Sequence, residues 1–141
     1  MSFVDRFVVD TGVLVSAALW PKTVPAEALA LAFRTGSLWV SGETLAELSE
    51  VLQRSKFERY LALTKRIAFY NDCAQNTQLL SVHSAVHDCQ DPKDNKFLAL
   101  ALDAQAGVLI SSDAHLTSLT PWRGVAVVTP AQFIGLAGGA A

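Results

Sequence analysis

Acidic residues that are far apart in the sequence have the types and positions that could do chemistry. Asp10 ends the apolar run "RFVVDTGVLV", Asp113 follows the apolar run "VLIS", and Asp94 opens the apolar stretch "NKFLALAL". An isolated ionised carboxylate at the edge of a core is costly, so Asp10 must be paired, solvated or bound to something. Ligands of open α/β sheets gather outside the carboxyl ends of the strands. We therefore expect Asp10, Asp94 and Asp113 to converge at one edge of a sheet.

Glu47 is the fourth candidate. It lies on a helix predicted at 42–55, with Glu43 four residues before it and Glu50 three residues after it, so that all three share roughly one helix face. A solvated acidic face is the simpler interpretation of Glu43 and Glu50. The apolar neighbour Leu48 instead places Glu47 toward the edge of the core.

Carboxylates gathered within a few Å repel one another, so either their pKa values rise or a cation sits among them. Oxygen ligands without His or Cys at metal-ligand spacing favour Mg²⁺ or Mn²⁺ over Zn²⁺. A pair of such ions about 4 Å apart would hold the attacking and leaving oxygens of a phosphodiester displacement. His83, His87 and His115 form no recognisable catalytic triad. We expect His115 to be a rim residue rather than a ligand.

Each acidic candidate also has a structural explanation. Asp91 and Asp94 could cap the helix that follows them, and Asp113 could cap the short turn "AHLTSL". Thr11 could satisfy backbone groups at the end of the first strand or donate a hydrogen bond to a carboxylate.

The elements that must position these residues alternate between short apolar strands and helices. We expect strands at 7–15 (breaking near Gly12), 37–41, 79–82, 108–111 and 124–130. We expect helices at 26–36, 42–55, 56–78 (one or two helices) and 90–107, and a last helical turn at 131–136. This alternation is typical of an α/β domain with a mostly parallel sheet. The 141 residues fit one domain, with an ordered core at about 5–135 and a frayed tail at 136–141.

Composition narrows the function classes. The net charge of −2 and the pI of about 5.8 give no global basic field, so non-specific nucleic-acid binding through charge alone is not expected. Cys73 and Cys89 follow no metal spacing and no disulfide framework, which indicates buried or free thiols in a reducing cytoplasm. We expect neither a signal peptide nor a membrane span, because no stretch of about 20 uncharged apolar residues exists.

Four motifs in order, "VVDTGVLVSA", "SGETLAELSEVLQRSKFERYL", "DPKDNKFLALAL" and "VLISSDAHL", resemble the PIN-domain ribonucleases. The resemblance covers residues 5–135 and points to the bacterial branch of toxin components of toxin–antitoxin systems, the relatives of VapC. It implies a three-layer α/β/α sandwich with a mostly parallel sheet, and a Mg²⁺- or Mn²⁺-dependent endonuclease that acts on RNA.

The resemblance also implies roles for individual residues. The four catalytic and metal-binding acids fall on Asp10, Glu47, Asp94 and Asp113. Asp91 matches an additional acidic position of this branch, and the hydroxyl of Thr11 or Ser111 would support the metal ligands. Cations near the cleft that could contact RNA phosphates are Arg54, Lys56, Arg59, Lys93 and Lys96. Relatives commonly dimerise and are inhibited by an antitoxin, so a homodimer and an antitoxin partner are expected.

The chain departs from the family pattern at two positions. Gly12 replaces the Asn of the usual Asp-Thr-Asn start, and His115 stands where many relatives carry a second acid after Asp113. A catalytically degenerate PIN domain that binds RNA or protein is therefore the main alternative. An aspartate-nucleophile phosphatase would need a second Asp at the position of Gly12, and a receiver-like signalling domain would need a Lys after the late strand "VVTPAQ", where none occurs.

Overall fold

The core of the molecule is a five-stranded sheet in which all neighbouring strands are parallel. The computed structural model describes residues 3–139. The strands are β1 (Phe3–Val9), β2 (Ser37–Val40), β3 (Gln78–Leu79), β4 (Ala106–Ile110) and β5 (Ala126–Val128), in the spatial order β3-β2-β1-β4-β5. Strands β2 and β3 therefore lie on one side of β1, and β4 and β5, which come later in the chain, lie on its other side. The strand order reverses between β1 and β4.

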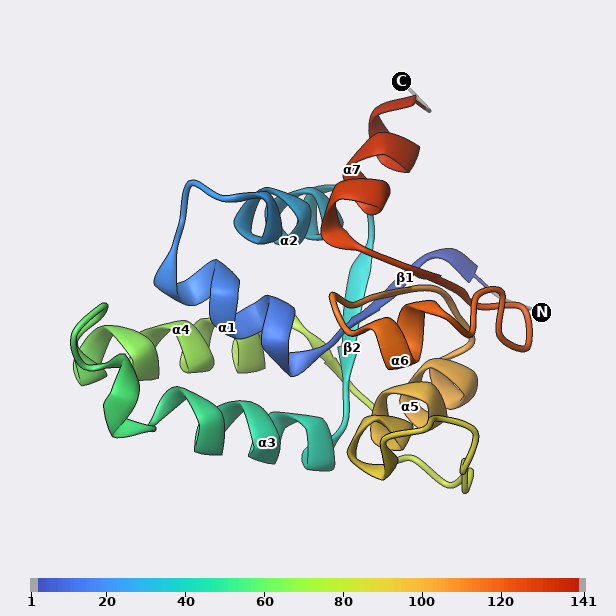
Figure 1. Cartoon of the computed structure of the whole chain (residues 1–141), viewed down its shortest axis with the longest axis horizontal. Helices are drawn as coiled ribbons and strands as arrows, with labels where there is room; N and C mark the ends of the chain where they lie inside the picture. Colours follow the sequence, from blue (N-terminus) through green and yellow to red (C-terminus); the bar gives the residue numbers. More distant parts are fainter. Residues whose placement is uncertain (1–2, 140–141) are drawn as a thin grey trace.

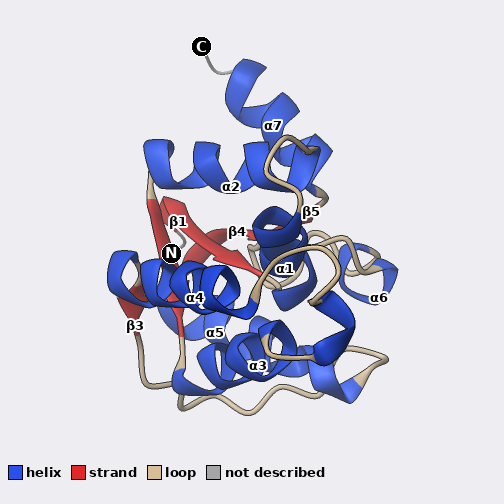
Figure 2. Ribbon diagram, turned by 90° about the vertical axis from the view of Figure 1, so that its left-hand side faces the viewer, coloured by secondary structure: helices blue, strands red, loops and turns tan. Residues whose placement is uncertain are grey.

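Helices cover both faces of this sheet. They are α1 (Thr11–Leu19), α2 (Val24–Thr35), α3 (Gly42–Leu52), α4 (Leu63–Asn76), α5 (Asn95–Ala104), α6 (Ala114–Thr117) and α7 (Pro130–Gly139), with short 3₁₀ turns η1 (Ser55–Phe57) and η2 (Pro92–Asp94). Helices α2 and α7 pack together at one end of the molecule, and α3 and α5 lie at the other end (Figures 1 and 2). Among the described residues, no helix has the length and apolar character needed to cross a membrane.

Two apolar clusters fill the two sides of the sheet. Neighbouring residues of β1 point to opposite faces, as the period of a strand requires. Phe7 and Val9 pack into the cluster that contains the buried faces of α1 to α4, whereas Val8 packs into the cluster formed with α5 and α6. Ile110 and Leu109 of β4 divide in the same way. The molecule is therefore a three-layer α/β/α sandwich, which confirms the predicted fold class.

The predicted strand at 7–15 is wrong beyond Val9. The strand stops there, and Thr11–Leu19 is the helix α1. Asp10 has an extended backbone and its carboxylate accepts a hydrogen bond from the Val13 backbone N–H, so that it caps this helix. Most residues of α1 are buried, so the apolar residues show no helical period. Without this period, the sequence of a short buried helix cannot be told from that of a buried strand.

The other elements differ from prediction mainly at their ends. The predicted strand at 79–82 is only Gln78–Leu79, and the predicted strand at 124–130 is only Ala126–Val128. The last helical turn is the longer helix α7. The tail expected to fray, 136–141, falls partly in α7 and partly, at residues 140 and 141, outside the described residues.

Candidate active site

The carboxyl ends of β1 and β4 lie side by side, and this pairing sets the position of the site. Val9 pairs with Ile110, and the Asp10 backbone N–H donates to the Ile110 carbonyl at 3.0 Å. The strand order reverses at these two strands, and crevices for ligands in open α/β sheets form at such a switch point. Asp10 and the segment after Ile110 are thereby brought to one crevice.

A cavity of about 180 Å³ occupies this place, lined by Asp10, Thr11, Gly12, Glu47, Asp94, Phe97, Ser112 and Asp113. Its four carboxylates come from four separate segments: the end of β1, helix α3, the turn before α5, and the segment after β4. The structure therefore brings the four predicted acids together. Their catalytic and metal-binding roles stay predictions.

Asp10 is the most buried of the four acids, with 7% of its surface exposed. Its Oδ1 accepts the Val13 N–H at 2.8 Å, and its Oδ2 accepts a hydrogen bond from the Ser111 hydroxyl. Burial raises the pKa of Asp10, and the two hydrogen bonds oppose this shift, while the charges of Asp113 and Glu47 add to it. Two donors thus fix the carboxylate in one orientation toward the cavity. The Ser111 hydroxyl thus contacts a predicted metal ligand, and its supporting role stays a prediction.

Asp94 and Asp113 form a close pair of carboxyl groups. Burial, followed by the neighbouring Asp113 carboxyl and the charges of Asp91 and Asp10, raises the pKa of Asp94 to about 7. The interaction with Asp94, together with the His115 backbone N–H, lowers the pKa of Asp113. The pair therefore favours one shared proton when no cation is bound. Asp113 also caps α6, as the structural explanation predicted, and Asp94 makes no capping hydrogen bond.

Glu47 makes an ion pair with the ammonium group of Lys96, whose side chain is only 14% exposed. Lys96 also donates to the Lys93 carbonyl at 2.5 Å. The sequence suggested Lys96 as a contact for RNA phosphates, and the structure shows that it offsets the charge of Glu47 within the site. Sequence reasoning missed this ion pair, although the position of Lys96 two residues after Asp94 placed it close to the site.

The remaining predicted residues lie at different distances from the cavity. Thr11 is buried and lines it, and Asp91 stands next to Asp94, where its Oδ1 accepts the Lys93 N–H at 3.1 Å. Lys93 is exposed on the turn η2. Arg54 pairs with Glu50, and Lys56 lies over the Phe57 ring. Arg54 and Lys56 follow the end of α3, and neither is among the residues that line the cavity.

One atom tests whether these residues suit a divalent cation. Oδ2 of Asp94 is buried and receives no hydrogen bond from any described residue. A buried carboxylate oxygen without a donor is costly, and a cation would satisfy it. The donors around it are carboxylate oxygens, the ligand type that Mg²⁺ and Mn²⁺ prefer. The site therefore fits such an ion.

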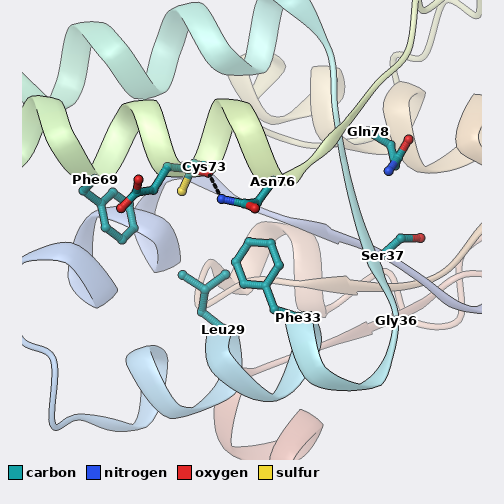
Figure 3. Close-up of a pocket in the computed structure, with 9 residues that line it drawn as sticks. Leu29, Phe33, Gly36, Ser37, Phe69, Cys73, Asn76 and Gln78 are labelled. Carbon is teal, nitrogen blue, oxygen red and sulfur yellow. Dashed lines mark hydrogen bonds between the residues drawn. The ribbon is translucent and has the colours of Figure 1, made fainter.

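A larger cavity, about 620 Å³, lies between α2 and α4 and has a different character (Figure 3). Leu29 and Phe33 of α2 face Phe69 and Cys73 of α4 across it. Among the described residues that line it, Asp72 alone is charged. This cavity offers an apolar wall but no converging set of reactive groups, so its size does not make it the site of chemistry.

A model of the PIN domain matches residues 6–115 of the chain. The chain belongs to the PIN domain family. This confirms the resemblance drawn from the sequence. The matched span contains all four acids of the cavity, and Asp113 lies near its end.

Other similar proteins extend along most of this PIN domain. An uncharacterized protein of Methanocaldococcus jannaschii, MJ1680, is 28% identical over 116 residues, which is 81% of this chain and 74% of the relative. A chain in the crystal structure of VapBC2 from Rickettsia felis bound to a promoter DNA fragment superposes with a TM-score of 0.62 at 11% identity, covering 88% of this chain and 98% of that one. The crystal structure of PAE2754 from Pyrobaculum aerophilum superposes with a TM-score of 0.64 at 16% identity. The superposition covers 94% of this chain and 90% of that one. These two structures share the fold.

Two lining residues of the PIN-domain cavity were not singled out from the sequence as part of the site. Phe97 is buried in the core and also forms a wall of the cavity. Ser112 lines it between Ser111 and Asp113. Their place follows from how α5 and the segment after β4 approach each other. The sequence predicted that Asp94 and Asp113 converge, but no residue type marks Phe97 or Ser112 as a lining residue.

Proposed function

We propose that this chain is a divalent-metal-dependent endoribonuclease that hydrolyses RNA phosphodiester bonds, with Asp10, Glu47, Asp94 and Asp113 as its catalytic and metal-binding residues. The observation that carries the proposal is the convergence of these carboxylates on one cavity around an unpartnered buried oxygen of Asp94. Membership of the PIN domain family supports the same chemistry, because the resemblance noted in the sequence is to PIN-domain ribonucleases.

We assign different roles to the metal, the acidic residues and Phe97 in this site. Bound Mg²⁺ or Mn²⁺ would supply a nucleophilic water at neutral pH and offset the charge that develops on the phosphodiester. Asp10 is oriented by the Val13 N–H and the Ser111 hydroxyl, and Glu47 is held by Lys96. The buried Phe97 ring closes one wall against bulk water, which strengthens electrostatic interactions within the cavity.

Substrate contacts are proposed on the basic residues nearest the cavity. Lys93 is exposed on η2 and Lys96 pairs with Glu47 in the site, and we propose that both contact phosphates of an RNA strand that enters it. Arg54 and Lys56 would contact phosphates only if the bound RNA extends along α3 toward η1. Contacts of this kind position the backbone and do not select a sequence.

We further propose that the chain is the toxin of a type II toxin–antitoxin pair, acting in the cytoplasm as a homodimer that an antitoxin protein inhibits. The fold shared with a chain of the VapBC2 structure supports a partner of this kind. Light scattering of the purified chain, alone and mixed with the product of a small neighbouring open reading frame, tests both associations. A chain that remains monomeric both alone and with this product would contradict the proposed homodimer and the proposed antitoxin complex.

The nuclease activity is tested with purified protein on a set of single-stranded and structured RNAs. We expect cleavage with Mn²⁺ or Mg²⁺, loss of cleavage in EDTA, and recovery when metal is added back. Asp10→Asn and Glu47→Gln should each reduce the rate by at least about a hundredfold, the scale at which an enzyme loses a group that stabilises its transition state. Asp72→Asn and Glu27→Gln are matched controls, because they make the same changes at exposed positions outside the cavity.

The alternative, a PIN domain that binds without cleaving, gives a different result. Intact RNA at every metal concentration, together with retained RNA or protein binding, would overturn the nuclease proposal. Equal cleavage by wild type and Asp10→Asn would point to a contaminating nuclease and overturn it as well.

A further inference from the structure

The imidazole of His115 stands beside two carboxylates of the site. One ligand atom each from Asp91, Asp94 and His115 lie within 4.8 Å of one another. The three residues come from two segments, the turn that precedes α5 and the first turn of α6. The sequence placed His115 at the rim, and the structure adds that a ring nitrogen lies close to Asp91 and to Asp94, which lines the cavity.

Hydrogen bonds hold the backbone of His115, whereas its side chain is partly open to solvent. The His115 N–H donates to Asp113 Oδ1 at 2.8 Å, and the His115 carbonyl accepts from the Cys89 thiol at 3.7 Å. The side chain is about half exposed, and its Nδ1 lies 3.7 Å from Asp113 Oδ1. The ring therefore lies close to Asp113 and also to the pair formed by Asp91 and Asp94.

An oxygen of Asp94 without a hydrogen-bond donor suggests what this group of residues could bind. Oδ2 of Asp94 is buried without a hydrogen-bond donor, and Asp94 is common to the acidic cavity and to the group with His115. Asp91 keeps its Oδ1 on the Lys93 N–H, which holds its carboxylate beside Asp94. A cation on Asp94 would thus find oxygen donors on one side and an imidazole nitrogen on the other.

We propose that a divalent cation bound by Asp94 also takes His115 as a nitrogen ligand, with Asp91 beside it, and that the site therefore selects Mn²⁺ over Mg²⁺. This inference rests on the proposed metal-dependent function. Mg²⁺ prefers carboxylate, carbonyl and water oxygens in near-ideal octahedral geometry, whereas imidazole binds transition metals. Mn²⁺ accepts carboxylates and lies in the transition-metal series, so a mixed oxygen and nitrogen set favours it.

The experiment detects the nitrogen ligand directly, without an activity assay. Electron spin-echo envelope modulation of the Mn²⁺-loaded protein should show nitrogen coupling in wild type and in the control His83→Gln, and His115→Gln should lose it. His83 is exposed and belongs to neither the cavity nor the Asp91 group. Calorimetric titration should show Mn²⁺ affinity reduced at least about tenfold in His115→Gln, with Mg²⁺ affinity nearly unchanged.

Two results would overturn the inference in distinguishable ways. Mn²⁺ binding that Asp10→Asn removes, without nitrogen coupling and with no effect of His115→Gln, would leave His115 as an ion-pair partner of Asp113 and leave the proposed function standing. No binding of Mn²⁺ or Mg²⁺ to the wild type would overturn this inference and the proposed metal-dependent function together.

Discussion

Lys96 shows how a single side chain changes the electrostatics of the site. The cavity gathers four carboxylates, and the Lys96 ammonium pairs with one of them, Glu47. Burial raises the pKa values of Asp10 and Asp94, and the charges of the neighbouring acids add to both shifts. Lys96 therefore offsets the charge of only one of the four carboxylates, and a cation would balance charge on the others.

Gly12 leaves room for the side chain that the family pattern usually places there. It is the second residue of α1, and a Cβ atom at this position would meet only Asp10 Oδ1, at 3.7 Å, an ordinary contact. We predict that Gly12→Asn tightens Mn²⁺ binding by about tenfold, because a polar neighbour that orients a metal ligand typically changes affinity on this scale. Calorimetric titration with Mn²⁺ measures it.

Gly42→Asn is the matched control for that prediction. Gly42 begins α3, and nothing lies within 4 Å of a Cβ built there. It should change the helix propensity in the same direction without touching the site. Equal Mn²⁺ affinity in Gly12→Asn and wild type would mean that the missing amide does not weaken this site.

At the level of elements, Arg66 is the side chain that joins α4 to the end of α3. It is 1% exposed, its Nε donates to the Leu61 carbonyl at 2.8 Å, and its Nη1 donates to the Leu52 carbonyl at 2.6 Å. It also pairs with Glu58. We predict that Arg66→Met lowers the free energy of unfolding by about 3 kcal/mol or more, because buried carbonyls lose their donors.

Urea unfolding followed by circular dichroism measures this change. Arg59→Met, at an exposed position over the Tyr60 ring, is the control and should stay within about 0.5 kcal/mol of wild type. An unchanged urea midpoint in Arg66→Met would show that Arg66 does not hold these elements together.

The turn between α5 and β4 contains a second testable feature. Gln105, with φ of 54°, ends α5 in the left-handed conformation, and its exposed side chain does not line the cavity. A left-handed conformation costs a residue with a Cβ about 1–2 kcal/mol, and Gly avoids most of this cost. We predict that Gln105→Gly raises the free energy of unfolding by about 0.5–1 kcal/mol, measured by urea unfolding. Gln75→Gly in the last turn of α4 should do the opposite.

Strand–helix alternation and the Asp residues at strand ends made most of this architecture predictable. The rule that ligands gather at the carboxyl ends of strands was enough to expect Asp10, Asp94 and Asp113 near one another. The helix α1 could not be predicted because it is buried on nearly all sides, which removes the helical period. The placement of Arg66 was equally hidden, since the carbonyls that it binds are brought together only by the packing of α3 and α4.

At the scale of the whole molecule, the acidic cavity links folding stability to pH and to metal. Without a cation, burial and the nearby Asp113 carboxyl raise the pKa of Asp94 to about 7, from 3.8 in an unfolded chain. The folded state therefore binds more protons than the unfolded state between about pH 4 and pH 7, and the free energy of unfolding falls as the pH rises through this window. The raised pKa of Asp10 acts in the same direction.

We predict that the melting temperature in EDTA is several degrees lower at about pH 8 than at about pH 5, and that Asp94→Asn reduces this difference. A divalent cation should reverse the trend, because it binds the deprotonated carboxylates of the folded state and so stabilises that state most where the protons have already left. Differential scanning calorimetry at the two pH values, with EDTA and with saturating Mn²⁺, measures both effects. A melting temperature in EDTA that rises from about pH 5 to pH 8, equally in wild type and Asp94→Asn, would show that the carboxylates do not repel one another as the geometry requires, and the physical reason for a cation at this place would be lost.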